Sequence, residues 1–237
     1  MTSAGVRSVL SVPARFSGPE GTANGGWIAG ELAGEVDCDG TVEVTLRRPV
    51  PLGTELTLGQ VANSVTLSHD GVVLAEAIPV TEDLTPPPFV PFNEAALAEE
   101  GFAGLRGEHP VPGCFVCGLR APGDGLRIFP GPVARTDLVA AGWRVPVMLG
   151  DDGAVPRALV WAALDCPSGW AHQGPEGPGL LGRITARTYR QVYPNGTYSV
   201  VGRSEGRDGR KLFGTSAVYE MDGTLVATAR ATWILPR

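Results

Sequence analysis

The feature that most constrains this chain is an arrangement that occurs twice along it: a helix of small and apolar residues, then strands that alternate polar and apolar positions. In the first half the predicted helix lies in TANGGWIAGELAGEV, and the strands lie within residues 41–83. In the second half it lies in GAVPRALVWAALDCPSGWA, and the strands lie within residues 182–235. Alternation with a period of two is typical of antiparallel strands that bury one face on a core. The repeat predicts an α+β chain of two units, each a central helix wrapped by a curved antiparallel sheet.

Turn sequences divide the strand regions of the two halves in a similar way. RRPVPLGTEL in the first half aligns with YRQVYPNGTY in the second, and SHDGVVLAEA aligns with GRDGRKLFGTSA. In the first half, turns are predicted at residues 51–53 and at Asp70-Gly71, with one long strand between them. In the second half, turns are predicted at residues 194–196, 208–209 and 222–223.

A proline-rich segment, which opens with EDLTPPPFVPF, separates the two units. It places the first unit at residues 1–84, a linker at residues 85–112 and the second unit at residues 113–237. Within the linker a short acidic helix is predicted around residues 93–100, with Asn93 as its N-cap. The chain of 237 residues is long enough for each unit to bury a core.

The composition argues against several classes of function. The net charge is -6 and there is no block of basic residues, which disfavours binding of nucleic acid through its phosphates. No apolar run approaches the ~20 residues that a membrane-spanning helix needs, and the first residues lack the apolar core of a signal peptide. Four cysteines in a chain of this length do not indicate a disulfide framework. A cytoplasmic protein without a membrane or nucleic-acid partner is expected.

Three motifs resemble sequences of the hotdog superfamily. NGGWIAGELA resembles the start of the hotdog helix, where His-Gly-Gly often precedes small and apolar residues, and RRPVPLGTELTL resembles the strand, turn and strand that follow. CFVCG followed by GDGL resembles the opening of bacterial hotdog domains related to thioesterases. The resemblance covers nearly the whole chain outside the linker and implies a double hotdog. It also implies acyl-CoA or acyl-carrier-protein thioesters as substrates, with hydrolysis as the main activity and hydration or dehydration of acyl chains in another branch. Two repeats already form the usual hotdog dimer within one chain, and because such units often pair again, a homodimer of chains is left open.

Hydrolysis of a thioester needs hydrogen-bond donors for the carbonyl oxygen as it gains negative charge, and also a base or a nucleophile. The N-terminus of a helix supplies free N–H groups with partial positive charge. Asn24, Gly25 and Gly26 fit this role, because the glycines let a substrate approach the backbone and Asn24 can cap the helix or orient the thioester. The same three residues also fit a capped helix whose glycines pack tightly on a sheet.

Asp165 is the candidate acid, base or nucleophile of the second half. It lies in an otherwise apolar helix, where burial of a carboxylate is costly and raises its pKa toward that of a general base. The hotdog resemblance implies a carboxylate about nine residues after the histidine of His-Gly-Gly. Counted back from Asp165 that position is Pro156, and counted forward from Asn24 it is Ala33. The first half therefore retains the glycines and the second half retains the carboxylate. This division predicts a single composite site formed by Asn24, Gly25 and Gly26 with Asp165. The mirror-image site, with Arg157 and Ala33, is predicted to be degenerate.

Other residues near these positions are candidates for binding the substrate. Trp27 and Trp161 are candidate walls of an acyl tunnel, and Ser168 is a candidate for positioning water or substrate. All three also fit roles in packing or in a turn. Asp165 itself also fits a carboxylate at the C-terminus of a helix that ends at Pro167.

Departures from the hotdog pattern leave other functions open. Asn24 replaces the common histidine, and Arg157 stands where a second glycine pair would be. The chain therefore also fits a hotdog protein that binds an acyl ligand without turning it over. Asp165 and His172 offer the residue types of the hydratase branch, although at a different spacing.

Cys114 and Cys117 form a C-x-x-C, a spacing used by zinc sites and by redox dithiols. A structural zinc site needs four ligands; His109 offers at most a third, and neither Cys38 nor Cys166 has a partner at this spacing. The pair follows a proline-rich linker instead of opening a helix after a strand, which disfavours redox chemistry. The motif is therefore predicted to mark the start of the second unit, with no metal or cofactor. A zinc-stabilised interaction module remains a third alternative.

Overall fold

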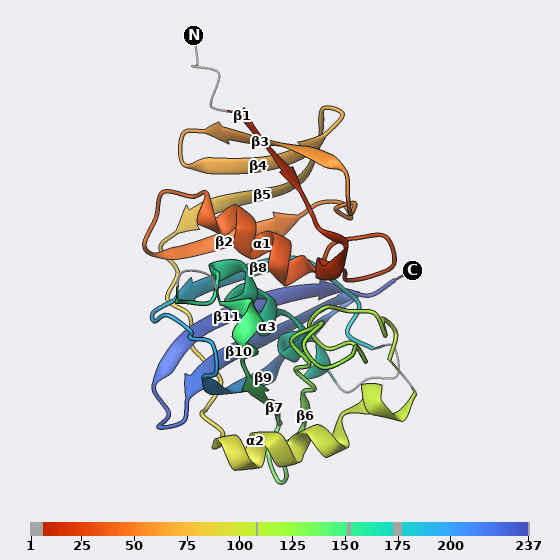
Figure 1. The fold of residues 1–237 in the computed structure, drawn as a ribbon, viewed down its shortest axis with the longest axis vertical. Helices are drawn as coiled ribbons and strands as arrows, with labels where there is room; N and C mark the ends of the chain where they lie inside the picture. Colours follow the sequence, from red (N-terminus) through yellow and green to blue (C-terminus); the bar gives the residue numbers. More distant parts are fainter. Residues whose placement is uncertain (1–6, 108, 151–152, 173–176, 237) are drawn as a thin grey trace.

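In the computed structural model, which describes residues 7–107, 109–150, 153–172 and 177–236, the chain forms one antiparallel sheet with helices packed on it (Figure 1). The order of the strands across this sheet is β1-β3-β4-β5-β2-β8-β11-β10-β9-β7-β6. The first five strands of the chain occupy one half of this order, and the last six occupy the other. Within the described part of the chain, no helix has the length and apolar character needed to cross a membrane.

The first half of the sheet surrounds helix α1 (Gly25–Gly34). Its strands are β1 (Arg7–Ser11), β2 (Thr41–Leu46), β3 (Glu55–Val61), β4 (Ser64–His69) and β5 (Val72–Val80), and the short helix η1 (Ala14–Phe16) follows β1. The helix begins where the sequence predicts, since the Asn24 side chain accepts a hydrogen bond of 2.9 Å from the N–H of Trp27. Asp70 and Gly71 have positive φ angles of 48° and 77°, and they form the predicted turn between β4 and β5.

The prediction of one long strand before this turn is wrong. The region folds into the β3–β4 hairpin, in which Val61 pairs with Ser64 across a turn made by Ala62 and Asn63. Ala62 adopts a φ of 51°, in the left-handed region that alanine rarely occupies. The turn therefore carries neither the glycine nor the Asp-Gly pair by which such turns are recognised in a sequence.

The second half of the sheet packs on helix α3 (Arg157–Trp170). Its strands are β6 (Gly131–Pro132), β7 (Leu138–Arg144), β8 (Leu180–Thr188), β9 (Thr197–Asp208), β10 (Lys211–Glu220) and β11 (Leu225–Ile234), with η4 (Val147–Leu149) after β7. Asn195 and Gly223, with φ angles of 62° and 87°, lie in the predicted turns before β9 and after β10. The turn between β9 and β10 lies one residue later than predicted, because Asp208 pairs with Lys211 and belongs to the ladder.

Helix α3 lies within the stretch predicted to be helical. The alternative in which the helix ends at Pro167 is wrong, since α3 runs through this proline to Trp170. Proline lacks the N–H of an internal helical bond, but every residue from Ala158 to Gly169 is buried, so packing outweighs the local cost. The backbone of Pro167 lies directly against Gly202 of β9, where a side chain would collide with the proline carbonyl.

The sheet and the helices both join the halves. Strands β2 and β8 pair antiparallel across the middle of the sheet, with Val44 opposite Ile184. Helices α1 and α3 lie side by side, antiparallel, on one face of the sheet (Figure 1). A Cβ atom on Gly30 of α1 would lie 2.6 Å from the Cα atom of Ala158, well inside normal contact distance. Glycines of α1 therefore permit the close approach of the two helices.

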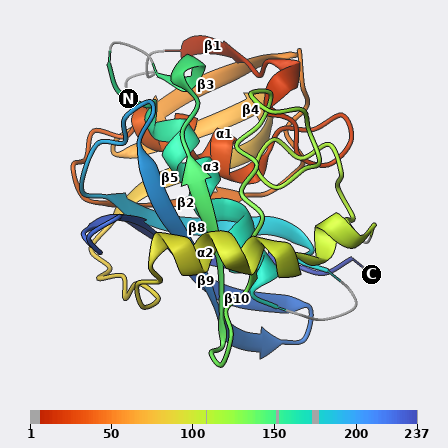
Figure 2. The ribbon, with the colours of Figure 1, turned by 60° about the horizontal axis from the view of Figure 1, so that its bottom comes forward.

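The linker packs on the second half of the sheet. It contains α2 (Phe92–Ala98), η2 (Glu99–Gly101) and η3 (Ala103–Arg106). Helix α2 lies across β7, as Figure 2 shows, and the Glu99 carboxylate accepts a hydrogen bond of 2.7 Å from the N–H of Gly142. Pro91 occupies the N-cap position, so the prediction of Asn93 as the cap is wrong: Asn93 lies inside the first turn.

Candidate active site

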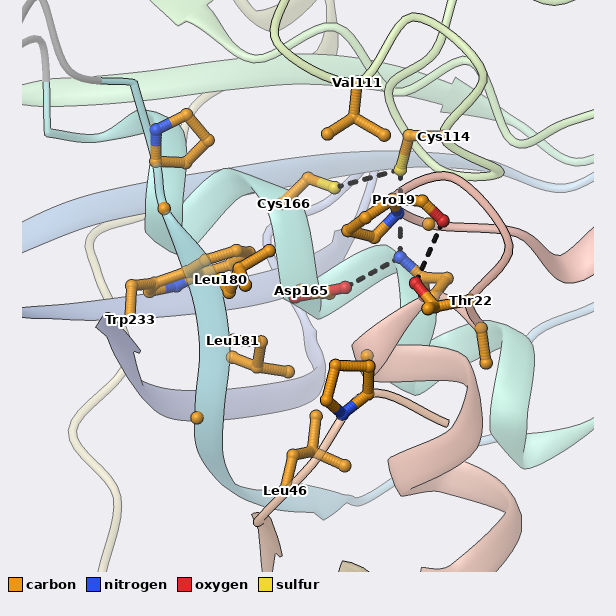
Figure 3. A pocket seen from close by; sticks show the side chains of 18 of the residues that line it. Pro19, Thr22, Leu46, Val111, Cys114, Asp165, Cys166, Leu180, Leu181 and Trp233 are labelled. Atoms are coloured by element: carbon orange, nitrogen blue, oxygen red, sulfur yellow. Dashed lines mark hydrogen bonds between the residues drawn. The ribbon is translucent and has the colours of Figure 1, made fainter. Parts of the chain in front are cut away.

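A cavity of about 490 Å³ lies between the two halves, where the end of α3 meets the start of α1 (Figure 3). Its walls come from the loop before α1, the end of β2, residues 109–117, the C-terminal part of α3 and the paired ends of β8 and β11. Leu46, Leu181 and Trp233 are among its apolar lining residues, and the exposed Arg47 and Arg48 lie at its rim. The interior of the cavity is therefore apolar, and its exposed lining carries both signs of charge, because Glu20 lies there too and Arg47 pairs with Glu76 at 2.6 Å.

The N-terminus of α1 lies at the wall of this cavity. The N–H of Trp27 is bound by the Asn24 cap, and the N–H of Gly26 donates to the Asp165 carboxylate. No acceptor among the described residues pairs with the N–H of Gly25, and Gly25 lines the cavity. The first turn therefore offers one unpaired backbone donor, with the partial positive charge of a helix N-terminus behind it.

Asp165 reaches this helix N-terminus from α3. Its Oδ2 atom accepts a hydrogen bond of 2.8 Å from the Asn24 side-chain amide and one of 3.0 Å from the N–H of Gly26. The side chain lines the cavity although only 2% of the residue is exposed, and its Oδ1 atom has no partner among the described residues. Burial raises the pKa of Asp165 to about 7, against the opposing effect of the Gly26 N–H. The structure therefore brings all four predicted catalytic residues together, with Asn24, Gly25 and Asp165 in the cavity wall and Gly26 bonded to Asp165.

The fold and this geometry can be compared with known proteins. No protein-family model and no curated protein matches the sequence. Solved structures match over nearly the whole chain. The tesB protein of Mycobacterium avium subsp. paratuberculosis is 16% identical, with a TM-score of 0.61, and the match covers 98% of this chain and 93% of that chain.

Two further solved structures show the same likeness. A hot dog fold protein of Alicyclobacillus acidocaldarius is 13% identical, has a TM-score of 0.61 and covers 98% of this chain and 93% of its own. The chain has a hotdog fold. The acyl-CoA thioesterase II TesB2 of Mycobacterium marinum is 13% identical, with a TM-score of 0.54, and the match covers 97% of this chain and 93% of that chain.

The opposite end of the α1–α3 pair has a different chemistry. Arg157 begins α3, and its guanidinium donates a hydrogen bond of 3.2 Å to the carbonyl oxygen of Ala33 in α1. A cation thus meets the C-terminal part of α1, where carbonyl groups carry partial negative charge. Among the residues that the structure describes, this end of the helix pair has no counterpart of the bond between Asp165 and Gly26.

The three residues predicted to bind substrate do not line the cavity. Trp27 stacks on Phe16 with ring centroids 4.3 Å apart, and Trp161 is 2% exposed in the contact between the helices. Ser168 donates to the carbonyl oxygen of Asp165 at 2.8 Å and accepts from the indole N–H of Trp233 at 2.9 Å. These side chains support the residues that form the walls.

His172 lies apart from the predicted carboxylate. One nitrogen of its ring bonds the carbonyl oxygen of Phe213, and the other bonds the hydroxyl of Ser204. The ring is therefore engaged by β9 and β10, and it does not pair with Asp165.

A group of three cysteines is the part of the site that sequence reasoning missed. The sulfur atoms of Cys114, Cys117 and Cys166 all lie within 4.8 Å of one another, and all three residues are buried in the cavity wall. Hydrogen bonds from the other two thiols hold the pKa of Cys114 well below its usual range. Cys166 follows Asp165 on α3, and its separation from the C-x-x-C by about 50 residues left no signal in the sequence.

Proposed function

We propose that this protein hydrolyses acyl thioesters of coenzyme A or of acyl-carrier protein at one composite site between its two halves. The observation that carries the proposal is the bond between Asp165 of the second half and the N-terminus of α1 in the first half, at the wall of an apolar cavity. A carboxylate and a backbone donor on one wall are what hydrolysis of a thioester needs.

In this proposal the thioester carbonyl oxygen accepts a hydrogen bond from the N–H of Gly25. The helix dipole stabilises the negative charge that develops on this oxygen. Water attacks the carbonyl carbon while Asp165 accepts a proton from it. The bond between carbon and sulfur then breaks, and the departing thiolate takes the proton from Asp165, which leaves a free acid and a thiol. The Asn24 amide holds the carboxylate in place throughout.

The walls of the cavity support the choice of substrate. Leu46 and Leu181 offer an apolar surface for an acyl chain, and removal of that chain from water favours binding. Arg48 is exposed and lines the cavity, where a guanidinium group suits the phosphates of coenzyme A or of a carrier-protein arm, whereas the guanidinium of Arg47 is paired with Glu76. Solved structures with the same fold carry the names tesB protein and acyl-CoA thioesterase II, which agrees with this substrate class.

The experiment is a thioesterase assay over a series of acyl-CoA chain lengths, with Asp165→Asn as the test variant. We expect kcat/KM to fall by about 100-fold or more, the range in which a general base contributes. Asp208→Asn is the matched control, because Asp208 is exposed at the end of β9 and does not line the cavity. Full activity of Asp165→Asn on every chain length would refute the site.

A second candidate is a protein that binds acyl-CoA without turning it over. It is favoured by the fact that Asn24 and Gly26 already occupy one oxygen of the Asp165 carboxylate. Saturable binding of acyl-CoA, measured by calorimetry, without hydrolysis of any chain length would support this candidate over the hydrolase.

Two further properties remain predictions. We propose that residues 1–84 and 113–237 form the two units, joined by residues 85–112, and that the chains pair into a homodimer. Limited proteolysis tests the first point, because cleavage between the units is expected within residues 85–112. Light scattering tests the second through the molar mass in solution.

A further inference from the structure

We propose that Cys114, Cys117 and Cys166 bind a thiophilic divalent metal ion, with zinc as the physiological ion, in the wall of the cavity. Residues 111–118 and helix α3 lie far apart in the sequence, and the three sulfur atoms are the point at which they meet. The proposal concerns this group alone and holds whether or not the chain hydrolyses thioesters.

The distances between the sulfur atoms fit a metal site. Sulfur ligands bound to zinc at about 2.3 Å in a tetrahedron lie about 3.8 Å from one another. The Sγ atoms of Cys114 and Cys166 lie 3.8 Å apart, and no pair in the group is separated by more than 4.8 Å (Figure 3). A small contraction of the group would place all three at bonding distance from one ion.

The surroundings of the sulfur atoms suit thiolates. The indole N–H of Trp170 donates to Cys117 at 3.4 Å, and the Asn24 amide donates to Cys114 at 3.8 Å. Such donors disperse the negative charge that three thiolates and one divalent ion leave behind, as the groups around bound metals commonly do.

The group also leaves room for a fourth ligand. His109 does not supply it, because its Nε2–H donates to the carbonyl oxygen of Cys117 and its Nδ1 accepts from the N–H of Val111. All three cysteines line the cavity, so the ion has a path from solvent and a water molecule can complete a tetrahedron. The bound ion would tie residues 111–118 to α3 and hold this wall of the cavity in shape.

The experiment measures metal in the full-length protein, purified with reductant and without chelator. We expect about one equivalent of zinc per chain by elemental analysis. After replacement by Co²⁺, we expect visible bands of tetrahedral cobalt and near-ultraviolet bands of thiolate-to-cobalt charge transfer. These spectra are recorded on the unaltered chain, so they remain informative if a cysteine variant fails to fold.

Variants assign the ligands. Changes in groups around a metal cost about 10–100-fold in affinity, so Cys114→Ser, Cys117→Ser and Cys166→Ser are each expected to weaken zinc binding by more than that. Cys38→Ser is the matched control: Cys38 lies before β2, outside the group, and we expect unchanged affinity.

Three results would overturn the proposal. One is zinc affinity in the unaltered chain no higher than in Cys166→Ser. Another is a cobalt form without thiolate charge-transfer bands. The third is a disulfide among the three cysteines in freshly purified, reduced protein, found by a loss of two hydrogens in peptide mass mapping.

Discussion

Gly26 is the residue whose replacement tests most directly the contact between α1 and α3 at the proposed site. A Cβ atom at this position would lie 2.5 Å from the Cβ of Asp165 and 2.7 Å from the carbonyl oxygen of Trp161. Carbon atoms pack at about 3.5–4.0 Å, so Gly26→Ala must separate α1 from α3 by about 1 Å.

The expected cost follows from this overlap. Overpacking of a buried contact costs about 1–3 kcal/mol, and the clash of Gly26→Ala is with backbone as well as side chain. We expect a loss of about 2 kcal/mol in the free energy of unfolding. In a chain of this size that lowers Tm by about 4–8 °C. Urea unfolding and a thermal scan measure the two quantities.

Two glycines of the same helix provide matched controls. Nothing lies within 4 Å of a Cβ atom on Gly34, so Gly34→Ala is expected to gain about 0.5 kcal/mol. Gly30→Ala collides with Ala158 and Trp161 and is expected to lose as much stability as Gly26→Ala, but it does not touch Asp165.

The value of kcat/KM distinguishes Gly26→Ala from Gly30→Ala. A displacement of about 1 Å can cost about 100-fold in rate, and Gly26→Ala moves the carboxylate from its donor. We therefore expect Gly26→Ala to lose about 100-fold in kcat/KM and Gly30→Ala to lose less. A Gly26→Ala variant as stable as Gly34→Ala would refute the helix contact on which this reasoning depends.

Three other substitutions have distinct expected results. Asn24→Ala removes the cap of α1 and is expected to lower unfolding free energy by about 1 kcal/mol in urea; unchanged stability would contradict the bond to Trp27. Arg157→Ala removes a half-buried hydrogen bond to Ala33 and is expected to cost about 0.5 kcal/mol with no change in turnover, whereas lost turnover would indicate a second site. Leu181→Trp narrows the cavity. For long acyl-CoA substrates, kcat/KM is therefore expected to fall by about tenfold for each methylene of the acyl chain that no longer fits. An unaltered chain-length profile would place the acyl chain elsewhere.

Local patterns in the sequence were sufficient for much of the fold. The Asn24 cap and the Asp70-Gly71 turn depend on residues within three positions of one another, and both lie where they were predicted. The errors came from residues that depart from local preference. Ala62 turns the chain without a glycine, and Pro167 remains inside α3, because burial of the surrounding residues outweighs the preference of each.

The candidate site was also predicted in part from the sequence and in part only from the tertiary structure. Its separate parts, a glycine pair at a helix start and a carboxylate in an apolar helix, are visible in the sequence because each is out of place in its surroundings. The tertiary structure decided which backbone donor each one meets: Asp165 accepts a hydrogen bond from the N–H of Gly26, and the N–H of Gly25 has no acceptor among the described residues.

The sequence alone determined the repeated helix-and-sheet unit, the helix cap and the carboxylate, since periodicity, capping and burial are properties of neighbouring residues. Only the tertiary structure decided that Cys166 joins Cys114 and Cys117, and that Trp27 and Trp161 lie in the core instead of in the cavity wall. The physical reason is that these outcomes depend on the packing of α3 against α1 and against residues 111–118. Contacts between segments that are distant in the sequence produce no regular spacing of residues by which they could be predicted.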